Sequence, residues 1–162
     1  MAGNLVLVGM ADLNAVNAPG GLTTLGLGSC VGIALYDQIH KIAGLAHIML
    51  PDSTKIQNNS VVAKFADTGT VKLINDMMRL GAKKELIKAK LAGGAQMFAF
   101  DSKNENMRIG DRNVEATLKI LQALRIPVLA QDTGLNYGRT VELYAEDGRF
   151  VIKTIGHGSR VI

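Results

Sequence analysis

The sequence contains one cysteine, three prolines and no tryptophan among its 162 residues. A single cysteine forms no disulfide within the chain, and it excludes a zinc site built from several cysteines. The longest apolar runs, near 31–36 and 45–50, are much shorter than the roughly 20 residues that a transmembrane helix needs. We therefore expect a protein that has no disulfide framework and does not insert into a membrane.

Basic residues are absent from the beginning of the sequence, where no Lys or Arg precedes Lys41. A secretory signal needs a basic segment before its apolar stretch, and the early apolar residues here are interrupted by Asn4 and Gly9. We therefore expect a cytoplasmic location. The length and the 48% content of hydrophobic residues are typical of one folded domain, which we expect to span residues 1–162.

The chain has 18 basic and 14 acidic residues, which give a net charge of +4 and an isoelectric point near 9.3. Basic proteins often bind nucleic-acid phosphates, but single-strand binders also need aromatic stacking surfaces, and only 4% of these residues are aromatic. The densest basic cluster ends in Lys88 and Lys90, which alternate with apolar residues as on the solvent face of a strand. We predict no nucleic-acid partner.

Alternating apolar residues and turn residues predict most of the strands. Strands are expected at 4–10, which is apolar on both faces and should be buried, and at 31–36, 41–49, 87–91 and 128–131. A final hairpin is expected from 140–146 and 149–155, with a type I′ turn at Asp147-Gly148. Residues 14–21 are expected to form a loop, because Asn, Pro and Gly collect there, and another polar loop follows Phe100.

Two helices are predicted from residues that recur at helical spacing. Val71, Ile74 and Met78 indicate a helix that ends at Gly81, and a second helix runs from Gly110 to about Leu124 with Asp111 as its N-cap. Strands and helices follow one another without a repeat. The predicted fold class is α+β, with mostly antiparallel sheets and two main helices.

A candidate nucleophile and a candidate base lie close together in the predicted hairpin of 31–36 and 41–49. If this hairpin turns on Gln38 and Ile39, paired residue numbers sum to 77, and Cys30 lies opposite His47. Opposed Cβ atoms are about 5 Å apart, which lets an imidazole nitrogen approach a sulfur. A three-residue turn would shift the register and remove this direct pairing.

The chemistry of a cysteine nucleophile explains what such a pair would do. The thiolate is the attacking form, and a thiol with a pKa of about 8.5 needs a nearby base at neutral pH. Gly26 and Gly28 would allow a sharp turn and bring backbone N–H groups toward an oxyanion. Thr23 or Thr24 would hydrogen-bond the second imidazole nitrogen and fix the tautomer.

These residues also have structural interpretations. A lone cysteine is usually a small buried apolar residue, and a histidine in a strand is usually structural. With the expected pairing and the glycines taken into account, the catalytic interpretation of Cys30 and His47 is as well supported as the structural one. His40 and His157 are expected at the surface, and Met77 and Met78 are expected in a helix core.

Six blocks follow one another along the chain: TLGLGSCV at 24–31, AHIMLPDS at 46–53, FADT at 65–68, LAGGAQMF at 91–98, IGDRNVEA at 109–116 and QDTGLNYGR at 131–139. With these blocks the sequence resembles the CheD family of chemoreceptor glutamine deamidases over nearly its whole length. Asp111 and Leu135 stand where Glu or Gly is often seen, and neither touches the expected chemistry.

The resemblance places the catalytic cysteine, histidine and threonine of the family on Cys30, His47 and Thr24. It implies that specific glutamines of methyl-accepting chemotaxis receptors are hydrolysed to glutamate, with release of ammonia, through a thioester on Cys30. His47 would be the base and Thr24 would orient it, with no metal or organic cofactor.

The resemblance also implies a catalytic fold similar to that of the cytotoxic necrotizing factor toxins, and binding by the phosphatase CheC in competition with receptors. The alternative hypothesis is a non-catalytic protein that binds receptors or CheC and modulates chemotaxis signalling. The glycine pair Gly93-Gly94 and the blocks Arg112-Asn113 and Asn136-Tyr137 are expected to shape the site or the docking face, and neither the residues nor the resemblance assigns them individual roles.

Overall fold

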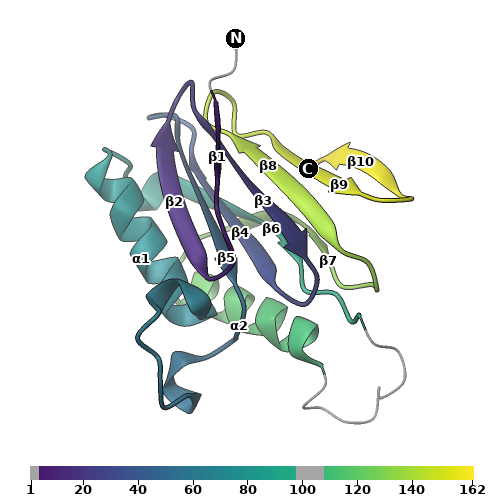
Figure 1. Cartoon of the computed structure of the whole chain (residues 1–162). Helices are drawn as coiled ribbons and strands as arrows, with labels where there is room; N and C mark the ends of the chain where they lie inside the picture. Colours follow the sequence, from purple (N-terminus) through teal and green to yellow (C-terminus); the bar gives the residue numbers. More distant parts are fainter. Residues whose placement is uncertain (1–3, 98–107) are drawn as a thin grey trace.

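The computed structural model describes residues 4–97 and 108–162, and it stacks two five-stranded sheets with two helices on one outer face (Figure 1). The first sheet has the order β1 (Leu5–Leu7), β3 (Gly21–Leu27), β8 (Arg139–Tyr144), β9 (Phe150–Thr154) and β10 (Gly158–Val161). The second has the order β2 (Asp12–Asn17), β5 (Ile42–Ile48), β4 (Val31–Asp37), β6 (Ile87–Gly93) and β7 (Val128–Thr133).

The helices α1 (Ala66–Arg79) and α2 (Ile109–Ala123) cover the second sheet on the side away from the first (Figure 1). Short 3-10 turns lie at η1 (Ser53–Lys55), η2 (Val62–Lys64) and η3 (Lys84–Leu86). Within the described residues, no helix has the length and apolar character needed to cross a membrane.

The central strands β4 and β5 of the second sheet are buried on both faces, so their side chains belong to two separate cores. Successive side chains of a strand point to opposite faces. Val31, Ile33 and Leu35 pack toward the helices, whereas Ala34 belongs to the core between the two sheets. A side chain in β4 or β5 therefore faces either the helices or the first sheet according to its place in this alternation.

The predicted α+β class with two helices is confirmed. The sheets are antiparallel except for the parallel pairs β1–β3 and β6–β7. Strands lie where 31–36, 41–49, 87–91 and 128–131 were predicted, and β8 and β9 form the predicted hairpin. The polar loop expected after Phe100 falls mostly outside the described residues.

Predictions at three of the four sheet edges were wrong, whereas the edge strand β7 lies where it was predicted. The strand expected at 4–10 is shortened to β1, and its three residues are exposed because β1 pairs only with β3 at the edge of the first sheet. The loop expected at 14–21 begins inside β2, which pairs antiparallel with β5 and forms an edge of the second sheet. Edge strands tolerate polar residues, so the asparagines of β2 gave no strand signal. The final strand, β10, was not predicted.

Three local details also differ from the predictions. In α1 the buried face contains Leu73, Ile74 and Met77, while Val71 and Met78 are 40% and 46% exposed. The α2 helix begins at Ile109, so Asp111 lies in its first turn, where a carboxylate still interacts favourably with the helix dipole. Five residues, 145–149, connect β8 to β9, and of the predicted turn pair only Gly148 has a positive φ, of 76°, so the turn is not type I′.

Candidate active site

The hairpin of β4 and β5 has a different register from the predicted one. Gly32 lies opposite His47, so paired residue numbers sum to 79, and four residues, 38–41, connect the strands. The longer turn is stabilised by the Asp37 carboxylate, which accepts hydrogen bonds of 3.0 Å each from the backbone N–H groups of Ile39 and His40. The predicted direct pairing of Cys30 with His47 is therefore wrong.

The register is shifted by two residues, and a shift of two keeps each side chain on its own face of the sheet. Cys30, directly before β4, belongs to the core between the sheets together with Ala34. His47 lies in β5 in alternation with Ala43 and Leu45 of that same core. Cys30 and His47 are thus diagonal neighbours on one face, a separation that longer side chains bridge.

Thr24 joins His47 to the first sheet. Its Oγ1 donates a hydrogen bond of 2.6 Å to the carbonyl of Val8 and lies 2.7 Å from Nδ1 of His47. A carbonyl only accepts and a hydroxyl has one hydrogen, so Nδ1–H of the imidazole must donate to Thr24. In the neutral ring this assignment leaves Nε2 without a proton. Nε2 is buried and has no hydrogen-bond partner among the described residues.

Burial favours the neutral forms of both candidate catalytic groups. Desolvation lowers the pKa of His47 below its ordinary value. Desolvation also raises the pKa of the Cys30 thiol, and a hydrogen bond from the backbone N–H of Cys30 opposes this effect only in part. At neutral pH the pair therefore consists of a thiol and an imidazole with a vacant acceptor nitrogen.

A family model described as "CheD chemotactic sensory transduction" matches residues 49–154. The "Probable chemoreceptor glutamine deamidase CheD" of Lachnoclostridium phytofermentans is 56% identical over 160 residues, which cover 99% of each chain. The "Chemoreceptor glutamine deamidase CheD" of Halalkalibacterium halodurans is 52% identical over 162 residues, which cover 98% of this chain and 99% of the relative. The chain belongs to the CheD family.

A solved structure, the Bacillus licheniformis hypothetical protein YfiH, matches with a TM-score of 0.48 and 14% identity, covering 77% of this chain and 51% of that chain.

The segment matched by the CheD model begins after Thr24, Cys30 and His47. The family model therefore says nothing of these three residues, and a role for them has to be argued from their geometry.

The glycine pair of the CheD block LAGGAQMF supports the loop that carries Cys30. The N–H of Gly94 donates to the carbonyl of Cys30 at 2.8 Å, and the N–H of Ala95 donates to the carbonyl of Gly28 at 2.8 Å. A Cβ atom on Gly93 would lie 2.3 Å from the carbonyl oxygen of Cys30, and the φ of Gly93 is 104°. Only glycine permits this approach, so Gly93 is a packing requirement of the cysteine loop.

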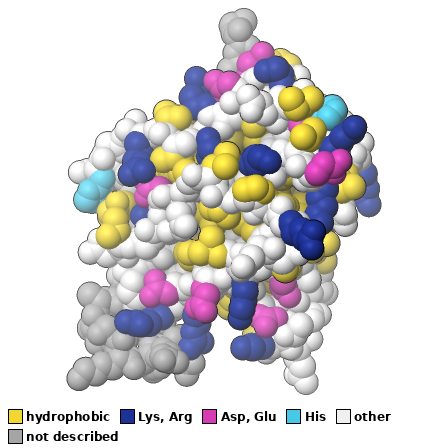
Figure 2. All heavy atoms as spheres, turned by 180° about the vertical axis from the view of Figure 1, so that it is seen from behind, with side chains coloured by type: hydrophobic (Ala, Val, Ile, Leu, Met, Phe, Trp, Pro, Cys, Tyr) yellow, Lys and Arg dark blue, Asp and Glu magenta, His cyan; other side chains and the backbone are white. Residues whose placement is uncertain are grey.

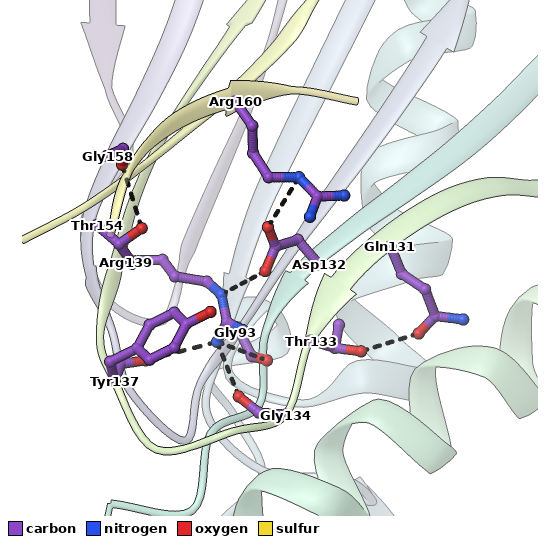
Figure 3. A network of polar contacts seen from close by, with 10 residues as sticks. All are labelled: Gly93, Gln131, Asp132, Thr133, Gly134, Tyr137, Arg139, Thr154, Gly158 and Arg160. Carbon is purple, nitrogen blue, oxygen red and sulfur yellow. Dashed lines mark hydrogen bonds and ion pairs between the residues drawn. The ribbon is translucent and has the colours of Figure 1, made fainter. Parts of the chain in front are cut away.

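Arg139 is a buried residue near the site. It was not singled out from the sequence. It is 1% exposed, and its Nε donates to Asp132 Oδ1 at 2.9 Å (Figure 3). Its Nη1 donates to the carbonyls of Gly134 at 3.0 Å and Gly93 at 3.4 Å, and its guanidinium lies over the ring of Tyr137. Arg139 thereby fastens the loop after β7 to the glycine pair beside Cys30.

The sequence did contain a signal for this arginine. Arg139, Val141 and Leu143 are the inward-facing residues of β8, so a charged residue stands at the start of an apolar alternation. A buried arginine needs a carboxylate, and Asp132 stands in the same QDTGLNYGR block. Tyr137, left unassigned by the sequence, stacks on His157 with ring centroids 4.2 Å apart.

Other surface features do not form part of this site. A groove of about 550 Å³ beside α2 is lined by residues of both charges, and neither Thr24, Cys30 nor His47 is among them. Figure 2 shows basic and acidic side chains interspersed on the back face of the molecule. Within residues 4–97 and 108–162, no three His, Cys, Asp or Glu side chains are grouped so that they could hold a metal ion.

We expect His47 to make the protein less stable as the pH falls through mildly acidic values. Because burial lowers the pKa of His47 in the folded protein, the unfolded chain binds this proton first when the pH falls below about 6.5. Protonation then favours unfolding, so stability is lost as the pH decreases. Urea denaturation at several pH values would measure this dependence.

The matched variant is His47→Gln, which removes this imidazole and keeps His40 and His157. Its free energy of unfolding should vary less between pH 7 and pH 5 than that of the wild type. The thiol of Cys30 does not contribute in this range, because its raised pKa keeps it protonated. Equal slopes in the two proteins would contradict the prediction.

Proposed function

We propose that this CheD-family chain is a cysteine-dependent protein-glutamine deamidase that acts on methyl-accepting chemotaxis receptors, and that residues 1–162 form one deamidase domain. The substrate class is supported by the names of relatives that are 52% to 56% identical over nearly the full length. The chemistry is supported by one observation above all: the hydrogen bond of Nδ1 to Thr24 leaves Nε2 of His47 as an acceptor on the face shared with Cys30.

In the first half of the reaction, Cys30 attacks the carboxamide carbon of a receptor glutamine while Nε2 of His47 takes the thiol proton. The carbonyl oxygen becomes an oxyanion, which we assign to backbone N–H groups of the 28–30 loop. The N–H of Gly28 already donates to the carbonyl of Gly26 at 3.0 Å, so the assignment falls on Ser29 and on Cys30, whose N–H would exchange its own sulfur for the oxyanion. The imidazolium then protonates the leaving nitrogen, ammonia departs, and a thioester remains.

In the second half, His47 takes a proton from water, which attacks the thioester carbon. The Cys30 sulfur leaves and recovers its proton from His47, and the product is a glutamate side chain. Thr24 accepts a hydrogen bond from Nδ1–H in both the neutral and the cationic ring, so it orients the imidazole throughout the cycle. No step in this sequence requires a metal or an organic cofactor.

The proposed partners are the receptors and the phosphatase CheC. Both follow from the family resemblance, and the proposed location is the cytoplasm. A binding protein without catalysis would have the same partners, so the deciding observation is chemical turnover.

The test is incubation of the full chain with a cytoplasmic fragment of a chemoreceptor from the same organism, followed by mass spectrometry of the fragment and an ammonia assay. We expect conversion of glutamine to glutamate at defined positions, with one ammonia released for each converted side chain. A folded protein that binds the receptor fragment and converts no glutamine would overturn the proposal in favour of the binding role.

A further inference from the structure

Asn113 connects the two backbone segments that carry the candidate catalytic residues. It lies in α2 and is fully buried. Its Nδ2 donates to the carbonyl of Ser29 at 2.9 Å and to the carbonyl of Met49 at 3.0 Å. Ser29 directly precedes Cys30, and Met49 follows the β5 strand that holds His47. One amide nitrogen, with its two hydrogens, therefore joins the cysteine loop to the end of the histidine strand.

The position of Asn113 is fixed by close contact of α2 with the segment after β6. A Cβ atom on Gly110 would lie 2.3 Å from the carbonyl oxygen of Ala95, and one on Gly94 would lie 2.2 Å from a methyl carbon of Val114. The beginning of the helix thus rests on the backbone that also binds Cys30. The Asn113 side chain therefore projects from a helix packed closely against that backbone rather than from a loop.

The bond to Ser29 acts directly on the nucleophile through the peptide group. The carbonyl of Ser29 and the N–H of Cys30 belong to one planar unit, so fixing the carbonyl also fixes the direction of that N–H. A hydrogen bond accepted by a carbonyl also strengthens the N–H of the same unit as a donor. The N–H of Cys30 hydrogen-bonds the sulfur of its own side chain, and we have assigned it to the oxyanion.

We propose that Asn113 is a positioning residue of the deamidase, which sets the orientation of the Ser29–Cys30 peptide and its placement against the His47 strand. The kinetic test of this proposal rests on the deamidase activity proposed above, whereas its chemical test does not depend on that activity. Asn113 touches neither the substrate nor the reacting atoms. It acts through the backbone of the nucleophile.

The kinetic test compares Asn113→Ala and Asn113→Asp with the wild type. Aspartate has nearly the same shape as asparagine, but its carboxylate donates no hydrogen bond to the two carbonyls. A misplacement of about 1 Å can cost about 10²-fold in rate, so we expect kcat on the receptor fragment to fall by about 10- to 100-fold in both variants. The KM should remain within about twofold, because the docking surface is unchanged.

Thr117→Val is the matched control. Thr117 is buried one helical turn after Asn113, and its hydroxyl donates to the Asn113 backbone carbonyl at 2.7 Å, so the variant removes a buried polar group without altering the bonds to Ser29 and Met49. It should keep the wild-type kcat. If Thr117→Val lowers kcat as much as the Asn113 variants do, at a similar loss of stability, the role of Asn113 is only structural and the proposal is wrong.

The chemical test uses the fact that Cys30 is the only cysteine of the chain. The rate of alkylation by iodoacetamide, followed against pH by mass spectrometry, measures how readily this thiol ionises. We expect the midpoint to move to higher pH in Asn113→Ala and to stay at the wild-type value in Thr117→Val. Asn113→Asp is left out of this test, because its own negative charge would raise the pKa of the thiol. An unchanged midpoint in Asn113→Ala would overturn the proposal. If the wild type itself converts no receptor glutamine, the proposed function fails, and the alkylation profile still decides the role of Asn113.

Discussion

Replacement of Cys30 by alanine is expected to abolish conversion of receptor glutamines while the protein remains folded. Without the sulfur no thioester forms, and removal of a catalytic nucleophile lowers kcat by about 10⁴-fold or more in comparable enzymes. Cys30 is at the margin of the core between the sheets, 9% exposed, so truncation should lower the free energy of unfolding by only about 1 kcal/mol. Mass spectrometry of the receptor fragment measures the first effect, and urea denaturation measures the second.

Two further variants separate loss of the nucleophile from loss of its base. Cys30→Ser keeps the size of the side chain but replaces a thiol by a much weaker acid, so it should be as inactive as the alanine variant. His47→Gln keeps the nucleophile and removes the base, so the loss in kcat should be about 10²- to 10⁴-fold. Glutamine conversion that survives in Cys30→Ala would contradict the mechanism. A Cys30→Ala protein with the full wild-type effect on receptor signalling would favour the binding role.

The face shared by Cys30 and His47 was predictable from the sequence, although the register was not. The turn length depends on hydrogen bonds accepted by Asp37, and no simple pattern of turn residues reveals them. Because the error amounted to two residues, it preserved the side of the sheet on which each side chain lies. An error of one residue would have placed the cysteine and the histidine on opposite faces.

Reasoning from the residues alone left Thr23 and Thr24 as alternatives, and only the resemblance pointed to Thr24. The hydroxyl of Thr23 donates to the carbonyl of Val141, across the pairing of β3 with β8. The hydroxyl of Thr24 meets His47, which lies in the other sheet. Local sequence carries no information about which sheet will stack on which, so the geometric reason for Thr24 rather than Thr23 becomes visible only when both sheets are in place.

The same limit applies to the edge strands. Leu5 and Leu7 are apolar, yet β1 is exposed, whereas the polar β2 still completes its sheet. Position at an edge is a property of the whole topology. The strand β6 was predictable because Ile87, Ala89 and Leu91 face a core and Lys88 and Lys90 do not. The alternation of buried and exposed residues made β6 predictable, whereas the residues of the edge strands β1 and β2 did not reveal their positions.

Replacement of Arg139 by methionine is expected to lower the free energy of unfolding by about 3 to 5 kcal/mol, because it removes one partner of a buried ion pair. The Arg139 side chain is 0% exposed and that of Asp132 is 10% exposed, so water compensates poorly for the lost bond. The Gly134 carbonyl also loses this donor, while the Gly93 carbonyl keeps the hydrogen bond of 3.0 Å from the N–H of Gly134. Urea denaturation followed by circular dichroism suits this measurement, because the chain has no tryptophan.

Arg160→Met is the matched control, because Arg160 contacts the same carboxylate. Its Nε lies 3.3 Å from Asp132 Oδ2, but its side chain is 64% exposed. Exposed ion pairs contribute about 0 to 1 kcal/mol, so this variant should be nearly as stable as the wild type. Similar losses in the two arginine variants would show that burial does not govern the network and would contradict the prediction.

A double variant distinguishes the cost of an unpaired charge from the cost of lost packing. In Arg139→Met alone, the Asp132 carboxylate keeps its charge and its semi-buried position, with only the exposed Arg160 as its partner. Adding Asp132→Asn removes that charge, so the double variant should recover part of the stability that the single variant loses. Arg139 donates to the Gly93 carbonyl, and Gly93 packs against the Cys30 carbonyl. The double variant, which lacks this arginine, should therefore still have a lower kcat than the wild type on the receptor fragment. Recovery of stability without recovery of kcat would place the function of Arg139 in the support of the cysteine loop.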